Sequence, residues 1–499
     1  MPTREPLSRR LFMGSAYALL ATIVGQGLAL LTSIVYARVL GDHDLGVLAI
    51  YSQLASLAVA FASVSLGTPI TRFVAKLRGE SPLKLEKFIA TVFVVILSAT
   101  VLVSVGLLLF ALSGGLGIYR SPELVVMIEL TSAFLVLNSL AGVGAAVLQG
   151  LQRIRRLSIV GIVSEALTVP VMFISLSAFG LIGAALGGIV LVAFSTAALF
   201  GSSWRDLRRE GVRFRLSIDR EAAGSLVIYA LPLLLSGFFV RGALFLQSSF
   251  LALDLGFADA GLFRVASTIT RVIALVPGAI SIPLLPALTE LYATSTAERA
   301  RKNLTTIIRI AVLVGVPLSL AIGFLARPII VVLYGASYRN ATTLAFVLVM
   351  AAFVDIVNAI ATNSLLGEGR TRELLSLDIG QSILVVLGTV VFVQWFGLLG
   401  VGYAALLASL AFGAAILVLL GRRGRVDLRR VASPLAFAGG GFALATVAVV
   451  ALGALTNYGL GALLALVSLG ASWILLQRDE RKLLVGLVRS IFHRAPHSR

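Results

Sequence analysis

The sequence predicts an all-α protein that crosses a membrane about fourteen times, and three observations support this. Hydrophobic residues make up 59% of the 499 residues and charged residues only 13%, whereas soluble domains have about 45–50% apolar residues. Apolar stretches of about 20 residues, each long enough to cross a bilayer as a helix, recur along the chain. Basic residues stand between these stretches, as in the cytoplasmic loops of membrane proteins.

The expected helices follow from apolar runs bounded by turn residues and charges. The first six cover residues 11–37, 45–71, 88–113, 123–149, 157–179 and 181–203. The second six cover 222–250, 259–289, 303–325, 339–366, 374–395 and 398–421, and a final pair covers 432–454 and 459–477. The tightest joints are expected at 179–180 and 395–397.

The distribution of basic residues predicts the orientation. If the amino terminus is cytoplasmic, the inward segments carry 33 basic residues. The outward segments carry four, which are Arg38, Arg120, Arg327 and Arg339. Because basic residues concentrate in cytoplasmic loops, both termini are predicted to lie on the cytoplasmic side of the cell membrane.

Sequence patterns that recur at nearly one offset indicate an internal duplication. The pattern L-G-x-x-D-x-G occurs at 40–46 and again at 255–261. At an offset of 217, G-x-x-R-x-R at 150–155 corresponds to 367–372, and F-G-L-x-G at 179–183 corresponds to 396–400. Each copy contains six expected helices, so both copies should insert with the same orientation.

Four domains follow from the duplication. An N-terminal six-helix bundle covers 1–203, and a cytoplasmic linker covers 204–221. A C-terminal six-helix bundle covers 222–421, and two additional helices with a cytoplasmic tail cover 422–499. The two bundles should be related by an axis along the membrane normal, with the substrate site between them near mid-membrane.

Arg241, Arg264 and Arg271 lie well inside expected helices. A charge at the bilayer centre costs roughly 2.5–3.5 kcal/mol, so such residues usually face an interior cavity or a partner. Arg264 and Arg271 are seven residues apart and therefore share a helix face, while Arg241 occupies the repeat position of Gln26. A guanidinium donates paired hydrogen bonds to phosphate and keeps its charge, so these arginines are the candidate pyrophosphate-binding residues.

The acidic candidates within expected helices are Glu129, Glu165, Asp355 and Asp378. Two roles stay open for them: coupling to an ion such as H⁺ or Na⁺, or structural pairing with the buried arginines, of which Arg309 is a fourth. Structural pairing is the favoured alternative for the carboxylates. For the arginines, ion pairing and ligand binding are weighed equally.

Several function classes are disfavoured. There is no cysteine, the three histidines do not cluster within a span, and so no metal site is expected. No G-x-x-x-x-G-K-[ST] motif supports ATP hydrolysis. Because the basic residues are dispersed between apolar runs, nucleic acid is not an expected partner. The longest water-facing stretch is about 20 residues, so neither an enzyme with catalytic residues nor a cofactor is expected.

Short motifs along the chain carry a family resemblance. They are A-R-V-L-G at 37–41, G-T-P-I-T-R-F-V-A at 67–75, L-Q-G at 148–150, Y-G-A-S-Y at 334–338 and G-E-G-R-T at 367–371. With these motifs in this order, the chain resembles the polysaccharide exporters, or Wzx-type flippases, of the multidrug, oligosaccharidyl-lipid and polysaccharide (MOP) transporter superfamily.

The resemblance implies a fold like that of multidrug and toxin extrusion (MATE) transporters. It also implies movement of an isoprenoid-pyrophosphate-linked oligosaccharide from the cytoplasmic to the outer leaflet by alternating access, for surface polysaccharide or glycoconjugate synthesis. In related flippases, cavity arginines hold the pyrophosphate, a role that passes to Arg241, Arg264 and Arg271, and the last two helices help to accommodate the lipid tail. The implied partners are the lipid-linked glycan, membrane lipids, a coupling ion, and glycan polymerases or glycosyltransferases.

Two alternatives remain. A cation-coupled MATE-type multidrug antiporter is the second hypothesis, and Asp355 is the residue that best fits it. Against it, such proteins often carry a carboxylate in the first helix, and residues 11–37 contain no acid. A membrane-embedded glycan polymerase or glycosyltransferase is the least favoured hypothesis, because it would need a sizeable water-facing loop with catalytic groups.

Overall fold

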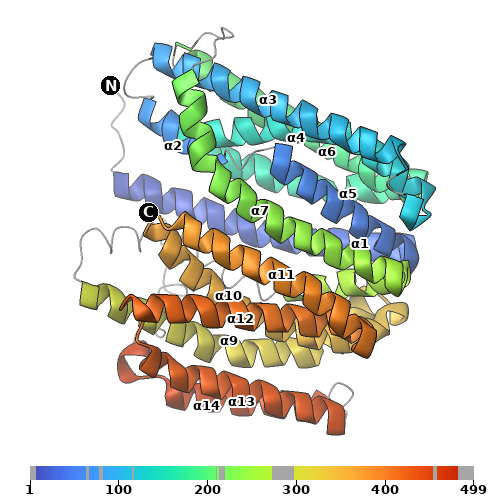
Figure 1. Ribbon diagram of the computed structural model, residues 1–499, viewed down its shortest axis with the longest axis vertical. Coiled ribbons are helices and arrows are strands. Elements are labelled where there is room, and N and C mark those ends of the chain that lie inside the picture. The colour runs from blue at the N-terminus through green and yellow to red at the C-terminus, as the bar shows by residue number, and fades with distance from the viewer. Residues whose placement is uncertain are drawn as a thin grey trace, which may run out of the picture.

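The computed structural model describes residues 7–62, 67–77, 82–114, 117–209, 211–212, 220–271, 297–452 and 458–481. Every regular element in these ranges is a helix, and the long helices run roughly alongside one another (Figure 1). The prediction of an all-α fold is therefore confirmed.

The N-terminal group of helices packs around α4 and α5. It comprises α1 (Leu7–Ala62), α2 (Gly67–Leu77), α3 (Pro82–Leu112), the short 3₁₀ helix η1 (Gly117–Tyr119), α4 (Pro122–Gly150), α5 (Ile154–Phe179) and α6 (Ile182–Arg209). Helix α4 packs on α2, α3 and α6, and α5 packs on α1 and α6. Together they form the blue to green part of Figure 1.

The C-terminal group packs around α10 and α12. It comprises α7 (Arg220–Asp254), helical residues 257–271, α9 (Ala297–Leu333), the 3₁₀ helix η2 (Ala336–Asn340), α10 (Ala341–Gly367), α11 (Thr371–Phe396) and α12 (Leu398–Arg422). Helices α13 (Leu428–Leu452) and α14 (Tyr458–Leu475) both pack on α9 and little on each other, at one end of the molecule (Figure 1).

The number of spans is not established at fourteen. Eleven helices among the described residues are long and apolar enough to cross a membrane, and residues 459–475 form a shorter apolar helix. Two expected spans lie in α1, which is interrupted by a non-helical kink at Gly41 (φ 77°, ψ −178°), between the two expected spans. Of the expected span 45–71, residues 45–62 belong to α1 and 67–71 to α2, while 63–66 lie outside the described residues. Of the expected span 259–289, residues 272–289 lie outside the described residues.

The two tight joints are present, and their geometry repeats. Helices α5 and α6 are joined at Gly180 (φ 56°, ψ −139°), and α11 and α12 at Gly397 (φ 55°, ψ −137°). These positive φ values favour glycine. Gly183 and Gly400 also correspond, because a β-carbon at either would overlap the backbone of the preceding helix. This likeness supports the duplication, while the four-domain division stays a prediction.

The helix ends define two faces of the molecule. The basic face carries the turns at 151–153, 368–370 and 423–427, and the opposite face carries the turns at 180–181 and 334–340. We keep these two names below. Of the linker expected at 204–221, residues 204–209 belong to α6 and 220–221 to α7, while 210 and 213–219 lie outside the described residues.

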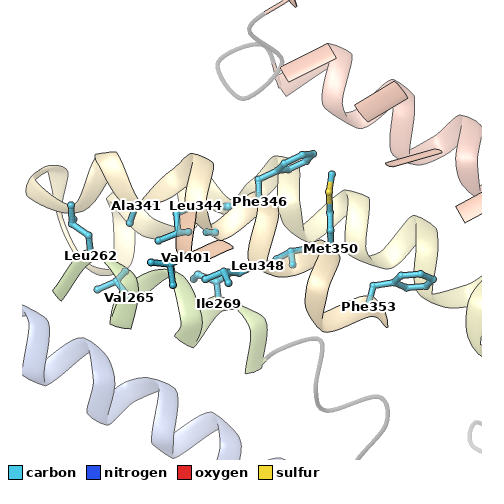
Figure 2. Packing of buried hydrophobic residues seen from close by; sticks show 14 of the residues in the cluster. Leu262, Val265, Ile269, Ala341, Leu344, Phe346, Leu348, Met350, Phe353 and Val401 are labelled. Carbon is cyan, nitrogen blue, oxygen red and sulfur yellow. The ribbon is translucent and has the colours of Figure 1, made fainter. Parts of the chain in front are cut away.

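The apolar core of the C-terminal group lies along α10, the most buried of the candidate spans. Leu262, Val265 and Ile269 of the segment 257–271 pack there with residues of α10 such as Leu344 and Leu348 (Figure 2). The segment that carries Arg264 is thus held in place by its own buried apolar face, which packs against α10.

Candidate functional site

Arg264 lies at the interface between the N-terminal and C-terminal groups. Its Nη1 donates to the carbonyl oxygen of Leu48 at 3.1 Å and to Oγ of Ser52 at 2.7 Å. Its guanidinium carbon lies 5.7 Å from the centre of the Tyr36 ring, a cation–π distance. All of these partners belong to α1, so Arg264 bridges the two groups.

Arg241 approaches the same helix one turn further along. Its Nη1 donates to Oγ of Ser56, and Ser52 and Ser56 are four residues apart on one face of α1. The residue Arg241 is exposed. The structure therefore brings Arg241 and Arg264, from two different elements, onto one stripe of α1.

Arg271 is exposed two helical turns beyond Arg264. Its side chain has no hydrogen bond or ion pair with the described residues, but its charge acts on both Arg264 and Tyr334. The three candidate arginines thus lie along one interface. Their role as a pyrophosphate site stays a prediction.

None of these three arginines forms an ion pair with any residue that the structure describes. The partners of Arg241 and Arg264 are hydroxyl and carbonyl oxygens, which are neutral. A charge within a membrane span that has no counter-ion is costly, so an anionic ligand at this interface would gain interactions that the protein alone does not supply.

Two of the candidate carboxylates have neutral partners as well. Asp378 accepts a hydrogen bond from Oγ of Ser236 and so joins α11 to α7. Asp355 is exposed on the otherwise largely buried α10 and accepts a hydrogen bond from Nδ2 of Asn358 at 3.3 Å. Asn358 also donates to the carbonyl oxygen of Ser409 on α12, at 3.0 Å.

The other two carboxylates lie in the N-terminal group, away from the arginines. Glu165 lines a cavity of about 440 Å³ between α4, α5 and α6, together with Asn138, Ser164 and Ser195. Glu129 is half-buried on α4. The structure therefore does not gather the four acids into one site, and the described residues contain no cluster of His, Asp and Glu suited to a metal ion.

Sequence reasoning missed Ser52, Ser56 and Tyr36, the partners of the arginines on α1. A signal was present, since two serines four residues apart in an otherwise apolar run place hydroxyls on one helix face. Serine also packs between transmembrane helices without any functional role, so this spacing gave no reason to select these positions.

The two groups are joined on the opposite face. Arg38 of α1 donates from Nε to the carbonyl oxygen of Leu333 at 3.0 Å and from Nη2 to that of Val332 at 2.8 Å. Tyr338 donates to the carbonyl oxygen of Ala37 at 3.0 Å. The structure is thus closed at the opposite face.

The repeated glycines complete this closure. Gly46 lies against the carbonyl oxygen of Phe257, and Gly261 lies against that of Asp42. In both cases a β-carbon would overlap the oxygen. The two copies of L-G-x-x-D-x-G therefore contact each other reciprocally, one from each group.

The basic face carries ion-pair clusters within each group. Asp206, which is buried, pairs with Arg156 at 2.8 Å and Arg153 at 3.5 Å. At the corresponding turn, Arg370 pairs with Glu368 at 3.0 Å and Glu373 at 2.8 Å. The hydrogen bond to Glu373 raises the pKa of Arg370 above its usual value. These arginines are thus occupied by protein carboxylates, unlike Arg241 and Arg264.

A comparison with models of protein families shows to which family the chain belongs. The model of a family described as polysaccharide biosynthesis protein matches residues 11–292, more than half of the chain. The chain belongs to this family. No curated protein matches the sequence significantly.

Solved structures share the fold. An inward-facing MATE multidrug resistance transporter of the MOP superfamily matches with a TM-score of 0.69 at 18% identity, covering 80% of this chain and 94% of that chain. The lipid II flippase MurJ in an inward closed conformation matches with a TM-score of 0.69 at 12% identity, covering 91% and 97%.

A third match is a MOP superfamily transporter from Pyrococcus furiosus, whose description notes a reversed polarity of the binding pocket. It has a TM-score of 0.62 at 16% identity and covers 83% of this chain and 95% of that chain. The chain therefore has the fold of the MOP transporters, as the resemblance implied, and with its many apolar helices it is a multi-pass membrane protein.

Proposed function

We propose that this protein is a flippase that moves an isoprenoid-pyrophosphate-linked oligosaccharide across the cell membrane. The observation that carries the proposal is the pair Arg241 and Arg264, which meet at the interface between the groups with only neutral partners. The family, whose members are described as polysaccharide biosynthesis proteins, favours a glycan as the cargo.

The geometry suits an anionic head group. The serine hydroxyls that Arg241 and Arg264 now contact are weak, neutral acceptors, and phosphate oxygens make shorter and stronger charge-assisted bonds. Arg271, further along the same interface, adds a third positive charge. A pyrophosphate carries enough acceptor oxygens to engage all three guanidiniums.

We assign the basic face to the cytoplasm and the opposite face to the outer leaflet, which places both termini in the cytoplasm. The contacts of Arg38, Tyr338 and the two glycine motifs then close the outer side, as expected of a conformation that receives cargo made in the cytoplasm. Alternating access would require these contacts to part and the basic face to close.

Other partners follow from the chemistry of this cargo. Glycosyltransferases must supply the lipid-linked glycan on the cytoplasmic side, and a polymerase or transferase must consume it on the outer side. Asp355 and Asp378, whose partners are neutral, are the candidates for coupling to H⁺ or Na⁺.

The test is reconstitution in liposomes with a lipid-pyrophosphate oligosaccharide. We expect Arg241→Gln and Arg264→Gln each to lower the flipping rate at least about tenfold, the effect of losing one charge-assisted hydrogen bond. The matched control is Arg155→Gln, which removes an exposed arginine from the basic face and should leave the rate unchanged. Full activity of both interface variants would overturn the proposed site.

A MATE-type cation-coupled antiporter is the second candidate, and the exposed Asp355 on a largely buried helix favours it. The same liposomes, loaded with a cationic dye, separate the two. Dye efflux that follows an ion gradient and is abolished by Asp355→Asn, without lipid translocation, would establish the antiporter. Two unpaired arginines at the interface oppose a cationic cargo, because like charges repel.

A further inference from the structure

A second basic site lies on the opposite face, and it includes none of the three interface arginines. A cavity of about 480 Å³ opens there between the end of α9, the turn η2 with the start of α10, and the corner between α11 and α12. It is lined by Arg327, Arg339, Asn340, Thr342, Thr343, Phe396, Leu398 and Leu399. This volume is within the range of small-ligand sites.

The charge of this cavity is unusual for its position. The opposite face has only four basic residues in the whole sequence, and two of them, Arg327 and Arg339, line this one cavity. Of the other two, Arg38 is occupied by the carbonyl oxygens of α9. Chance placement of scarce arginines rarely brings two together, so the cavity is a concentrated positive site.

Neither guanidinium of the cavity has a protein counter-ion. No acidic residue lines the cavity, and among the described residues neither Arg327 nor Arg339 has an ion pair or a side-chain hydrogen bond. The cavity at the basic face provides the contrast. There Arg301 pairs with Asp427 at 3.1 Å, and Glu298 contributes a second negative charge. The pair Arg327 and Arg339 is thus left for an external anion.

The walls of the cavity are held in place by the fold. Tyr338, 1% exposed, anchors η2 through its hydroxyl to the carbonyl oxygen of Ala37, so the adjacent Arg339 is fixed at the cavity. Gly397, which has a positive φ angle, turns the chain between α11 and α12. This turn places Phe396 and Leu398 on the wall of the cavity that faces η2.

The surroundings place the cavity at the level of lipid head groups. Trp395 and Phe396 are 73% and 51% exposed at the end of α11, and exposed aromatic residues mark the membrane–water interface. The lining combines two cations and the polar side chains of Asn340 and Thr343 with three apolar side chains. This composition matches a phosphate attached to a hydrocarbon chain better than a free ion.

We propose that this cavity binds the phosphate of an anionic lipid in the outer leaflet. Arg327 and Arg339 would hold the phosphate oxygens, and Phe396, Leu398 and Leu399 would contact the first carbons of the chain. Two sources share this chemistry: a bulk anionic phospholipid and the translocated lipid-linked product. The site does not rest on the flippase proposal, because lipid binding is measured without transport.

The experiment uses the tryptophan at the rim as a local probe. The chain has three tryptophans, and substitution of Trp204 and Trp473 by Phe leaves only Trp395. The full-length protein is placed in phosphatidylcholine vesicles with increasing fractions of either brominated phosphatidylglycerol or brominated phosphatidylcholine, which quench a nearby tryptophan. We expect phosphatidylglycerol to quench Trp395 at a fraction about tenfold lower, the effect of one charge-assisted contact.

Arg327→Gln combined with Arg339→Gln should abolish the preference for phosphatidylglycerol. Arg120→Gln is the control, because it removes another exposed arginine from the same face but lies outside the cavity, and it should keep the preference. Equal quenching by the two lipids in the protein with both arginines, or a preference that survives in the double variant, would overturn the proposal.

A second arm distinguishes the two lipid sources. A lipid-pyrophosphate sugar is added to vesicles in which brominated phosphatidylglycerol already quenches Trp395. Relief of quenching at a small fraction of the added lipid would support the site and assign it to the product of flipping. Retained quenching would support the site as one for bulk anionic phospholipid.

Discussion

Arg309 is the buried arginine with a clear structural role. It pairs with Glu480 at 2.7 Å, the two side chains being 7% and 3% exposed. Its other nitrogens donate to the carbonyl oxygens of Arg430 and Leu475, at the start of α13 and the end of α14. One guanidinium on α9 therefore anchors both appended helices at the basic face.

This anchor gives a stability prediction. Arg309→Leu leaves Glu480 buried without its partner, so we expect a loss of about 3–5 kcal/mol and a lower melting temperature of the purified protein. Replacing both residues by Leu should recover much of the loss, because an apolar pair of similar volume is often as stable as a buried ion pair. If Arg309→Leu is as stable as the unchanged protein, then Arg309 does not anchor the two helices.

The pH dependence of stability can be predicted at Asp427, in the turn before α13. Burial opposes ionisation of this carboxyl, but the hydrogen bond from Arg301 and the charges of Arg301 and Arg430 outweigh it and lower its pKa. A lowered pKa in the folded state means that the ion pairs contribute stability above the unfolded pKa, near 3.9. The contribution is lost as pH falls through the folded pKa.

We therefore expect the melting temperature to fall less steeply in Asp427→Asn than in the unchanged protein as the pH falls below about 4. At neutral pH the variant should be slightly less stable, because its contacts with Arg301 and Arg430 are weakened. Melting curves recorded across this pH range are the measurement. Parallel pH profiles for the two proteins would show that the pKa of Asp427 is not lowered by folding.

The residue scale also shows the limit of reading sites from sequence. Depth in the span and register in the repeat selected Arg241 and Arg264, and the structure brings both onto α1. The same argument left Arg309 outside the candidate site but could not identify its partner, because Glu480 lies beyond the last expected span, 171 residues away. Such a distant pairing leaves no local pattern.

At the scale of elements, hydrophobicity located most helices but not the start of α2. The expected span 45–71 runs into α2, which begins at Gly67 and is amphipathic. The break at Gly41 was predictable, because Arg38, Asp42 and Asp44 interrupt the apolar run there, and α1 bends at this glycine through a positive φ angle. Joints with a glycine in a repeated motif, at Gly180 and Gly397, were predictable.

The reciprocal glycine contact gives a prediction at this scale. A β-carbon at Gly46 or Gly261 would overlap a carbonyl oxygen of the other group, so Gly46→Ala and Gly261→Ala should each destabilise this conformation by about 1–3 kcal/mol. Gly188→Ala is the control, because no atom lies within 4 Å of a β-carbon there, and a helical alanine is neutral or stabilising. Thermal melting of the three variants measures the difference.

For the whole molecule, the sequence predicted the fold class well, because the membrane restricts spanning segments to few solutions and the duplication supplies the arrangement. The conformational state could not be predicted. It depends on contacts such as that of Tyr338 with Ala37, 301 residues apart in sequence. Those contacts join the two groups at the opposite face, and such pairings between residues far apart in the sequence leave no local pattern.

The closure itself can be tested, because the chain contains no cysteine to interfere. The rings of His43 and Phe257 are 5.3 Å apart across the two groups. Cysteines introduced at these two positions should react with a short cleavable thiol crosslinker in this conformation. If transport requires the opposite face to open, the crosslink should block flipping in liposomes, and cleavage of the linker should restore it.

The matched control places cysteines at Phe73 and Phe88, whose rings are 5.2 Å apart within the N-terminal group. This crosslink joins α2 to α3 and leaves the groups free to separate, so flipping should continue. Undiminished flipping with His43→Cys and Phe257→Cys crosslinked would show that the opposite face does not open during transport. In that case the cargo would have to cross by a route that leaves the glycine contact intact.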